Sequence, residues 1–158
     1  LSALMMLVIT GVGSLILLFS TEYMEHDRDY RRFFAEMSFF VFAMLLLVQA
    51  ANFLFLIVGW ALVGLASYLL IGFWFGERAN VEAGKKAFVV NRVGDFGFLV
   101  AMFLIWSTTQ HLDFAGAHAA LTPLAGTPVV LAIALMLFVG CAGKSAQLPL
   151  YIWLPDAM

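Results

Sequence analysis

The chain has 158 residues, of which 64% are hydrophobic and only 11% are charged, and its formal net charge is -2. Soluble domains are about half apolar and about a quarter charged, so this composition excludes an ordinary soluble enzyme. The small negative charge gives no electrostatic basis for binding nucleic acid.

Cysteine and histidine usage gives no support for a metal or cofactor site. Cys141 is the only cysteine, so the chain forms no internal disulfide. His26, His111 and His118 lie in polar connections, where we interpret them as surface residues. No Cys or His spacing is typical of a zinc or iron–sulfur site, and no glycine-rich phosphate loop follows a strand pattern. We therefore expect no metal and no cofactor in this chain.

Five continuous apolar stretches predict membrane helices. Each is close to the roughly 20 residues that cross a hydrocarbon core. None alternates as a strand would, and an open sheet leaves unpaired edges in lipid. We therefore predict an all-α fold, a polytopic transmembrane helix bundle that forms one domain over residues 1–158, and we interpret the sequence as truncated at both ends. The predicted helices are about residues 1–20, 33–52, 53–75, 87–107 and 128–147.

The connections between these stretches predict how the helices are oriented. If each stretch crosses once, connections 21–32 and 76–86 share one side of the membrane, and connections 50–53 and 108–127 share the other. We expect the end of the chain to return to the first side. Positive charge favours the cytoplasmic side or its equivalent, and the first side carries all the cations of the connections: Arg28, Arg31, Arg32, Arg78, Lys85 and Lys86.

Lys144 is the first candidate for a functional charged residue inside the membrane. An intramembrane lysine costs about 2.5–3.5 kcal/mol on insertion scales, and burial disfavours the charged form of an amine, so a buried lysine is suited to proton transfer. Gly140, Gly143 and Pro149 weaken the helix around Lys144, which predicts that the last helix is broken. Broken helices line the ion sites of transporters. The alternative is a lysine at a helix end whose amine reaches the membrane surface.

Arg92 and Asp95 are the next candidates. They are three residues apart, which places them on one face of the fourth predicted helix, near its start. They are interpreted as a charge pair beside a polar path, with the deeper Asp95 as proton carrier or counter-ion. For Arg92 we favour the alternative of an interfacial ion pair that orients the helix.

Two further features have plainer interpretations. Glu36, near the start of the second predicted helix, is interpreted as an interfacial residue. In the third predicted helix a stripe of small and aromatic residues favours close helix packing. The stripe recurs every four residues: Trp60, Gly64, Tyr68 and Gly72.

Four motifs in this order resemble the antiporter-like membrane subunits of respiratory complex I, the proton-pumping NADH:quinone oxidoreductase. They are YM…D…RRFF, GWALVGLASYLLIGFW, KAFVVNRVGDFGF and GKSAQLPLYIWLPDAM, from about Gly13 to Met158. Their combination is similar to the L-type subunit. The resemblance implies about fourteen transmembrane helices with two inverted five-helix repeats, of which this chain would be the third to the seventh helix.

The resemblance also implies a function and partners. It implies a proton-translocating subunit whose path centres on a buried lysine, here Lys144, and is coupled to remote redox chemistry. NADH, FMN, iron–sulfur clusters and quinone would bind to partner subunits, and this chain would carry out no redox chemistry itself. The implied surroundings are other membrane-arm subunits and the lipid bilayer, in a bacterial inner membrane or the mitochondrial inner membrane.

One position departs from the family pattern. The family has a glutamate directly after Gly59-Trp60, where this chain has Ala61, so the carboxylate expected to pair with Lys144 is missing. We hypothesise that Asp95 substitutes for it. Two alternatives to a complex I subunit stay open. One is a subunit of a cation/proton antiporter, a membrane hydrogenase or a bicarbonate-uptake complex. The other is a structural subunit in which the loss at Ala61 marks decay of the path.

Overall fold

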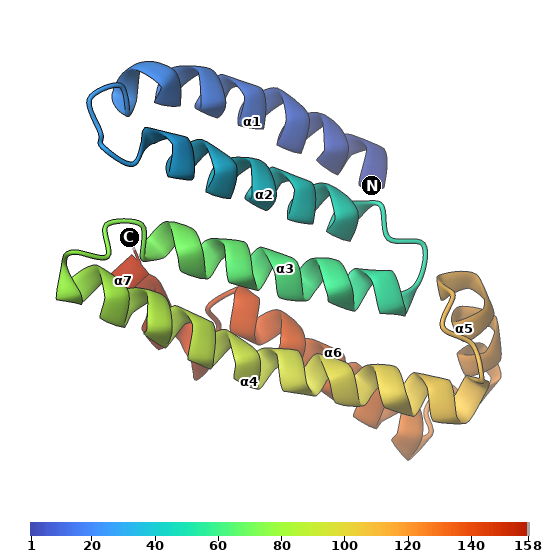
Figure 1. Ribbon diagram of the computed structural model, residues 1–158. Coiled ribbons are helices and arrows are strands. Elements are labelled where there is room, and N and C mark those ends of the chain that lie inside the picture. The colour runs from blue at the N-terminus through green and yellow to red at the C-terminus, as the bar shows by residue number, and fades with distance from the viewer. Residues whose placement is uncertain (158) are drawn as a thin grey trace.

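A computed structural model describes residues 1–157 and shows a bundle of helices (Figure 1), which confirms the all-α prediction. Within these residues no strand is present. The long helices are α1 (Ser2–Tyr23), α2 (Tyr30–Val48), α3 (Phe53–Ile71), α4 (Arg78–Thr109) and α6 (Pro128–Lys144). The short elements are α5 (Phe114–Leu121), the 3₁₀ turns η1 (Thr122–Leu124) and η2 (Leu150–Trp153), and α7 (Leu154–Ala157).

Successive long helices run in opposite directions and pack side by side (Figure 1). Helix α2 packs on α1 and α3, and α4 packs on α3 and most extensively on α6. The α1–α2 and α3–α4 connections lie at one end of the bundle together with α7, and the α2–α3 turn and α5 lie at the other. The predicted grouping of the connections is therefore confirmed. The assignment of the basic end to the cytoplasmic side stays a prediction.

Among the described residues, three helices are long and apolar enough to span a membrane by length and composition: α1, α3 and α4. Helix α6 is equally apolar in character but has 17 residues, and α2 carries Arg31, Arg32 and Glu36 in its first half. None of the most apolar window of α1 is buried inside the bundle. Such an outer surface suits contact with hydrocarbon rather than water.

Six of the predicted helix boundaries differ from the structure by three residues or more, and the largest difference is at the start of α4. This helix begins at Arg78 rather than residue 87, because the charged segment before the apolar run consists mostly of good helix formers. Arg92 and Asp95 consequently lie in the middle of α4 and not near its start. Helix α3 ends at Ile71 instead of residue 75, and α6 ends at Lys144 instead of residue 147.

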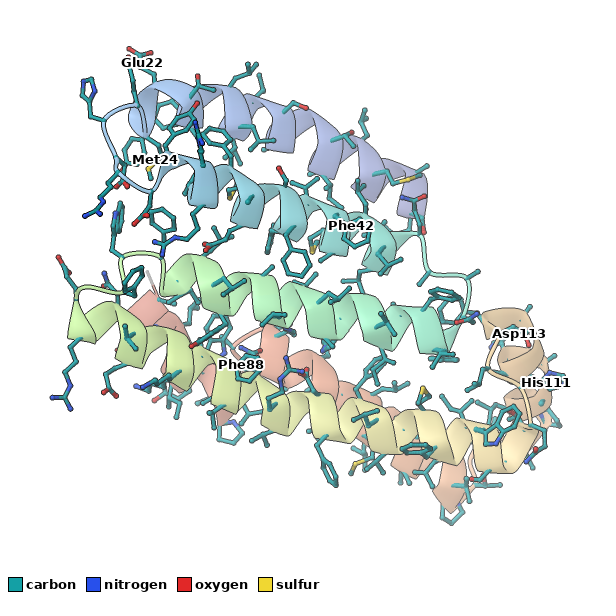
Figure 2. The ribbon with its side chains drawn as sticks, in the orientation of Figure 1. Glu22, Met24, Phe42, Phe88, His111 and Asp113 are labelled. Carbon is teal, nitrogen blue, oxygen red and sulfur yellow. The ribbon has the colours of Figure 1, made fainter. Side chains whose placement is uncertain are left out.

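The connection 108–127 is also more ordered than predicted, because it contains α5. The Asp113 carboxylate accepts a 2.6 Å hydrogen bond from the Gly116 amide and so caps this helix. Ala117 of α5 packs against Ile105 and Ile133 in the small apolar core at this end. Figure 2 shows Asp113 and His111 at the turn that leads into α5.

Glycines allow α4 and α6 to approach closely, and this contact sets the position of Lys144. A Cβ atom at Gly94 would lie 3.1 Å from the Cα of Gly143 and 3.3 Å from the carbonyl oxygen of Gly140. A side chain at any of these positions would separate the two backbones. The end of α6 is therefore held against the centre of α4 by backbone packing.

Candidate functional site

Lys144 is the last residue of α6, where the helix stops inside the bundle. Ala146 has a positive φ of 50°, and the chain resumes as η2 and α7, so the predicted break in the last helix is confirmed. The indole N–H of Trp153 donates a 3.1 Å hydrogen bond to the Gly143 carbonyl, which the helix leaves without an internal partner. A cation at this position is stabilised by the negative end of the α6 dipole.

The amine of Lys144 lies against α3. A Cβ atom at Gly64 would stand 2.8 Å from Lys144 Nζ and 3.5 Å from Arg92 Nη2, so the absence of a side chain at Gly64 makes room for both cations. Nζ lies 5.9 Å from the centre of the Trp60 ring, which is within cation–π range. Within residues 1–157, Lys144 forms no ion pair with a carboxylate at 4.0 Å or less.

Asp95 is the buried carboxylate of the same cluster, with 7% of its surface exposed. The Trp60 indole N–H donates a 2.8 Å hydrogen bond to Asp95 Oδ1. Arg92 Nη1 lies 2.9 Å from Oδ2, but the angle is not that of a hydrogen bond, and Oδ2 keeps no hydrogen-bond partner. Asp95 therefore uses Oδ1 for the hydrogen bond from Trp60, whereas Oδ2 has the Arg92 guanidinium as an ionic neighbour.

Arg92 is fixed by an aromatic ring as well as by Asp95. Its guanidinium lies 4.3 Å from the centre of the Phe88 ring, one turn earlier on α4. Figure 2 places Phe88 on the side of α4 that faces α3. The Arg92 side chain is 36% exposed, so the neighbouring helices cover it only in part. The interpretation of Arg92 as part of an interfacial ion pair stays a prediction.

Trp60 connects the two ionisable groups that the sequence singled out. Its N–H binds Asp95, its ring lies toward Lys144, and its other contact is a parallel stack on Phe98 with ring centres 5.3 Å apart. Asp95 and Lys144 therefore share Trp60 as a neighbour and do not form a direct pair.

The three site residues predicted from the sequence all meet in one cluster between α3, α4 and α6. Sequence reasoning missed Trp60 and Gly64 as members, because it preferred helix packing for their four-residue stripe and kept only Asn52, Ser67 and Tyr68 of this region as alternative lining of a hydrated path. The stripe does pack closely, and the same face contacts the charged groups. Ala61, beside Trp60, is only partly buried and brings no carboxylate. His26, His111 and His118 are exposed, which confirms their interpretation as surface residues.

The fold and the cluster together define a helical integral membrane protein with ionisable groups held inside the bundle. The chain belongs to the family described as NADH:quinone oxidoreductase/Mrp antiporter membrane proteins, whose model matches residues 50–158. A second model, for the N-terminus of chain 5 of NADH-ubiquinone oxidoreductase (complex I), matches residues 1–34.

Curated relatives carry names from the same enzyme group. The chain is 52% identical to NADH-quinone oxidoreductase subunit L of Mycobacterium tuberculosis. It is 48% identical to NADH-ubiquinone oxidoreductase chain 5 of Metridium senile, and 47% identical to the chloroplastic NAD(P)H-quinone oxidoreductase subunit 5 of Ipomoea purpurea. Each alignment covers all of this chain, but only 25%, 26% and 23% of the respective relative. The chain thus spans about a quarter of the length of these relatives.

Proposed function

We propose that this chain is part of a proton-translocating membrane subunit of an NADH:quinone oxidoreductase, with Lys144 as the central protonatable group. The observation that carries the proposal is the position of Lys144 at the end of broken helix α6, with its amine against Gly64 and Trp60 inside the bundle. An amine held away from bulk water, with a counter-charge nearby but not in contact, changes its protonation state with small changes in local field.

The other site residues take supporting roles in this proposal. Asp95 Oδ2 is buried, forms no hydrogen bond and lies 2.9 Å from the Arg92 guanidinium, and in this proposal Asp95 acts as the counter-charge of Lys144. A change in the field along the membrane arm shifts the balance between charged and neutral Lys144. Asp95 then stands in for the carboxylate that Ala61 lacks, acting through space and through Trp60 rather than by direct pairing.

The redox chemistry belongs elsewhere in the proposed complex. NADH, FMN, iron–sulfur clusters and quinone are assigned to partner subunits, and other membrane-arm subunits and lipid surround this chain. The proposed location is a bacterial inner membrane or the mitochondrial inner membrane. The names of the relatives support a multisubunit oxidoreductase.

A second candidate is a subunit of a cation/proton antiporter, because the description of the matching family also names Mrp antiporters. Purification of the intact protein from its native membrane separates the two. A complex I subunit co-purifies with NADH-oxidising activity, and an antiporter subunit does not.

Lys144→Ala tests the proposed function in the intact complex. In sealed vesicles we expect electron transfer from NADH to quinone to be slowed and the number of protons translocated per NADH to fall. Lys85→Ala is the matched control, because Lys85 is exposed and has no part in the cluster. Normal proton translocation in the Lys144→Ala complex would favour a purely structural subunit.

A further inference from the structure

A pocket with polar side chains in its lining lies at the basic end of the bundle, and its lining includes no residue of the Lys144 cluster. It has a volume of about 200 Å³ and is enclosed by α2, α3, the α3–α4 connection and the first turns of α4. A water molecule occupies about 30 Å³ in the liquid, so the pocket has room for several waters. Its polar side chains are Arg32, Glu36 and Tyr68.

Glu36 is held in this pocket with one oxygen unused. Its side chain is 13% exposed, and Oε1 lies 3.7 Å from Nε of Arg32. Oε2 is buried and has no hydrogen-bond partner. Within residues 1–157, Glu36 and Asp95 are the only carboxylates that have a buried oxygen without a hydrogen-bond partner. A buried carboxylate without a partner is costly, which favours either bound water or a proton on this oxygen.

Arg32 does not neutralise Glu36 completely, because its guanidinium is shared among several groups. Nη2 donates a 2.5 Å hydrogen bond to the Phe73 carbonyl and lies 3.3 Å from Asp29. The guanidinium also lies over the ring of Phe73 at 4.5 Å. The charged and titratable groups that face Glu36 are therefore Arg32 and Asp29 from its own helix and Tyr68 from α3. The pocket residue from α4, Val81, is apolar.

Tyr68 and Phe88 lie between this pocket and the Lys144 cluster. The Tyr68 ring packs against Phe88 with centres 5.4 Å apart, and the Arg92 guanidinium lies 4.3 Å from the centre of the same Phe88 ring. On α3, Tyr68 and Gly64 are four residues apart and share a face. The ring of Phe88 thus contacts both Tyr68 of the pocket and Arg92 of the Lys144 cluster.

We infer that Glu36 is a second protonatable carboxyl of the path, which takes up protons at the basic end and passes them by pocket water and Tyr68 toward the Arg92–Asp95–Lys144 cluster. The inference rests on the proposed function and extends it to a group on α2. Glu36 gains one proton from the aqueous side and releases one proton to the next acceptor, so the transfer step involves no change in oxidation state.

The first test needs no substitution. A membrane-soluble carbodiimide adds across the O–H of a protonated buried carboxyl and stays attached as an N-acylurea, with no leaving group. We expect mass spectrometry of the intact complex after treatment to find the adduct on Glu36, with more labelling as the pH falls. Exposed Glu82 serves as the internal comparison, because it is 62% exposed and paired with Arg78 on the surface of α4. Absence of an adduct on Glu36 at every pH would overturn the inference.

The second test uses Glu36→Gln, Glu36→Asp and the control Glu82→Gln in the intact complex. We expect Glu36→Gln to slow proton translocation in sealed vesicles roughly ten-fold, Glu36→Asp to restore part of the rate, and Glu82→Gln to have no effect. Normal translocation by Glu36→Gln would remove Glu36 from the path. If Glu36→Gln translocates protons normally but Lys144→Ala does not, this inference fails and the proposed function stands. If Lys144→Ala also translocates protons normally, the proposed function fails.

Discussion

The indole of Trp60 contacts Asp95 and Lys144 at once: its N–H donates a 2.8 Å hydrogen bond to Asp95 Oδ1, and its ring centre lies 5.9 Å from Lys144 Nζ. One rigid side chain on α3 thereby fixes a carboxylate of α4 and faces an amine of α6. The stack on Phe98 holds the ring in place. The relative positions of the two ionisable groups therefore depend on a residue that carries no charge itself.

Trp60→Phe should test the hydrogen bond to Asp95, because it keeps an aromatic ring but removes the N–H donor together with part of the indole ring system. Asp95 Oδ1 would then be left buried without a partner, and hydrogen bonds to charged groups contribute about 1.5–3 kcal/mol. We expect a loss of this size in the free energy of unfolding of the intact subunit, measured by SDS titration in mixed micelles. The control is Trp106→Phe, at an exposed tryptophan near the end of α4. Equal stability of the two variants would show that the hydrogen bond to Asp95 contributes nothing measurable.

Gly64→Ala should disturb proton translocation without disturbing assembly. The new methyl group would lie 2.8 Å from Lys144 Nζ, which is closer than van der Waals contact, so the flexible end of the lysine must move away. We expect the complex to assemble normally and to translocate fewer protons per NADH in sealed vesicles. Gly11→Ala on α1 is the matched control, because nothing lies within 4 Å of its added methyl group. Wild-type translocation by Gly64→Ala would mean that the position of the amine is not critical.

Gly94→Ala should destabilise the bundle, in contrast to Gly64→Ala. Here the methyl group meets backbone, at 3.1 Å from Gly143 Cα and 3.3 Å from the Gly140 carbonyl oxygen, and backbone of two packed helices cannot shift locally. Overpacking of this kind costs about 1–3 kcal/mol. We expect a lower yield of assembled subunit and a lower midpoint in the same SDS titration. Gly13→Ala, where the nearest atom is 3.9 Å away on Val41, should leave both unchanged.

The helices and the charged residues could be predicted from the sequence, whereas the geometry of the site could not. The lengths of the apolar stretches predicted the ends of the five long helices to within a few residues, except at the start of α4. That helix begins with a charged segment, which a search for apolar residues does not detect although the segment favours helix formation. Lys144, Arg92 and Asp95 were singled out because a charge in an apolar helix is costly wherever it lies. Their distances, and the part played by Gly64, depend on how α3, α4 and α6 approach one another.

Asp113 should make the start of α5 sensitive to acid. The hydrogen bond from the Gly116 amide is the main cause that lowers the pKa of the Asp113 carboxyl below its ordinary value. A lowered folded-state pKa means that the carboxylate stabilises α5 above its unfolded pKa, about 3.9, and that this contribution is lost as the pH falls through the folded pKa. We expect faster hydrogen exchange of the Gly116 amide, relative to its intrinsic rate, in that acid range.

Asp113→Asn and His111→Asn distinguish the cap from the neighbouring ion pair. An asparagine cap accepts the same hydrogen bond but does not titrate, so Asp113→Asn should keep α5 protected and abolish the acid sensitivity. His111→Asn removes the exposed contact of 3.4 Å between His111 Nδ1 and Asp113 Oδ1, and exposed ion pairs contribute little. The pH dependence should therefore survive in His111→Asn. Its disappearance there would assign the effect to the ion pair.

The orientation of the bundle is testable with single cysteines in a Cys141→Ser background. Glu25 lies in the α1–α2 connection at the basic end, His118 lies on α5 at the other end, and both are exposed. Because positive charge favours the cytoplasmic side or its equivalent, a membrane-impermeant maleimide added from that side should label Glu25→Cys and leave His118→Cys unlabelled. Addition from the opposite side should give the reverse pattern. Labelling of both cysteines from one side of sealed vesicles would contradict the placement of these connections on opposite faces of the membrane.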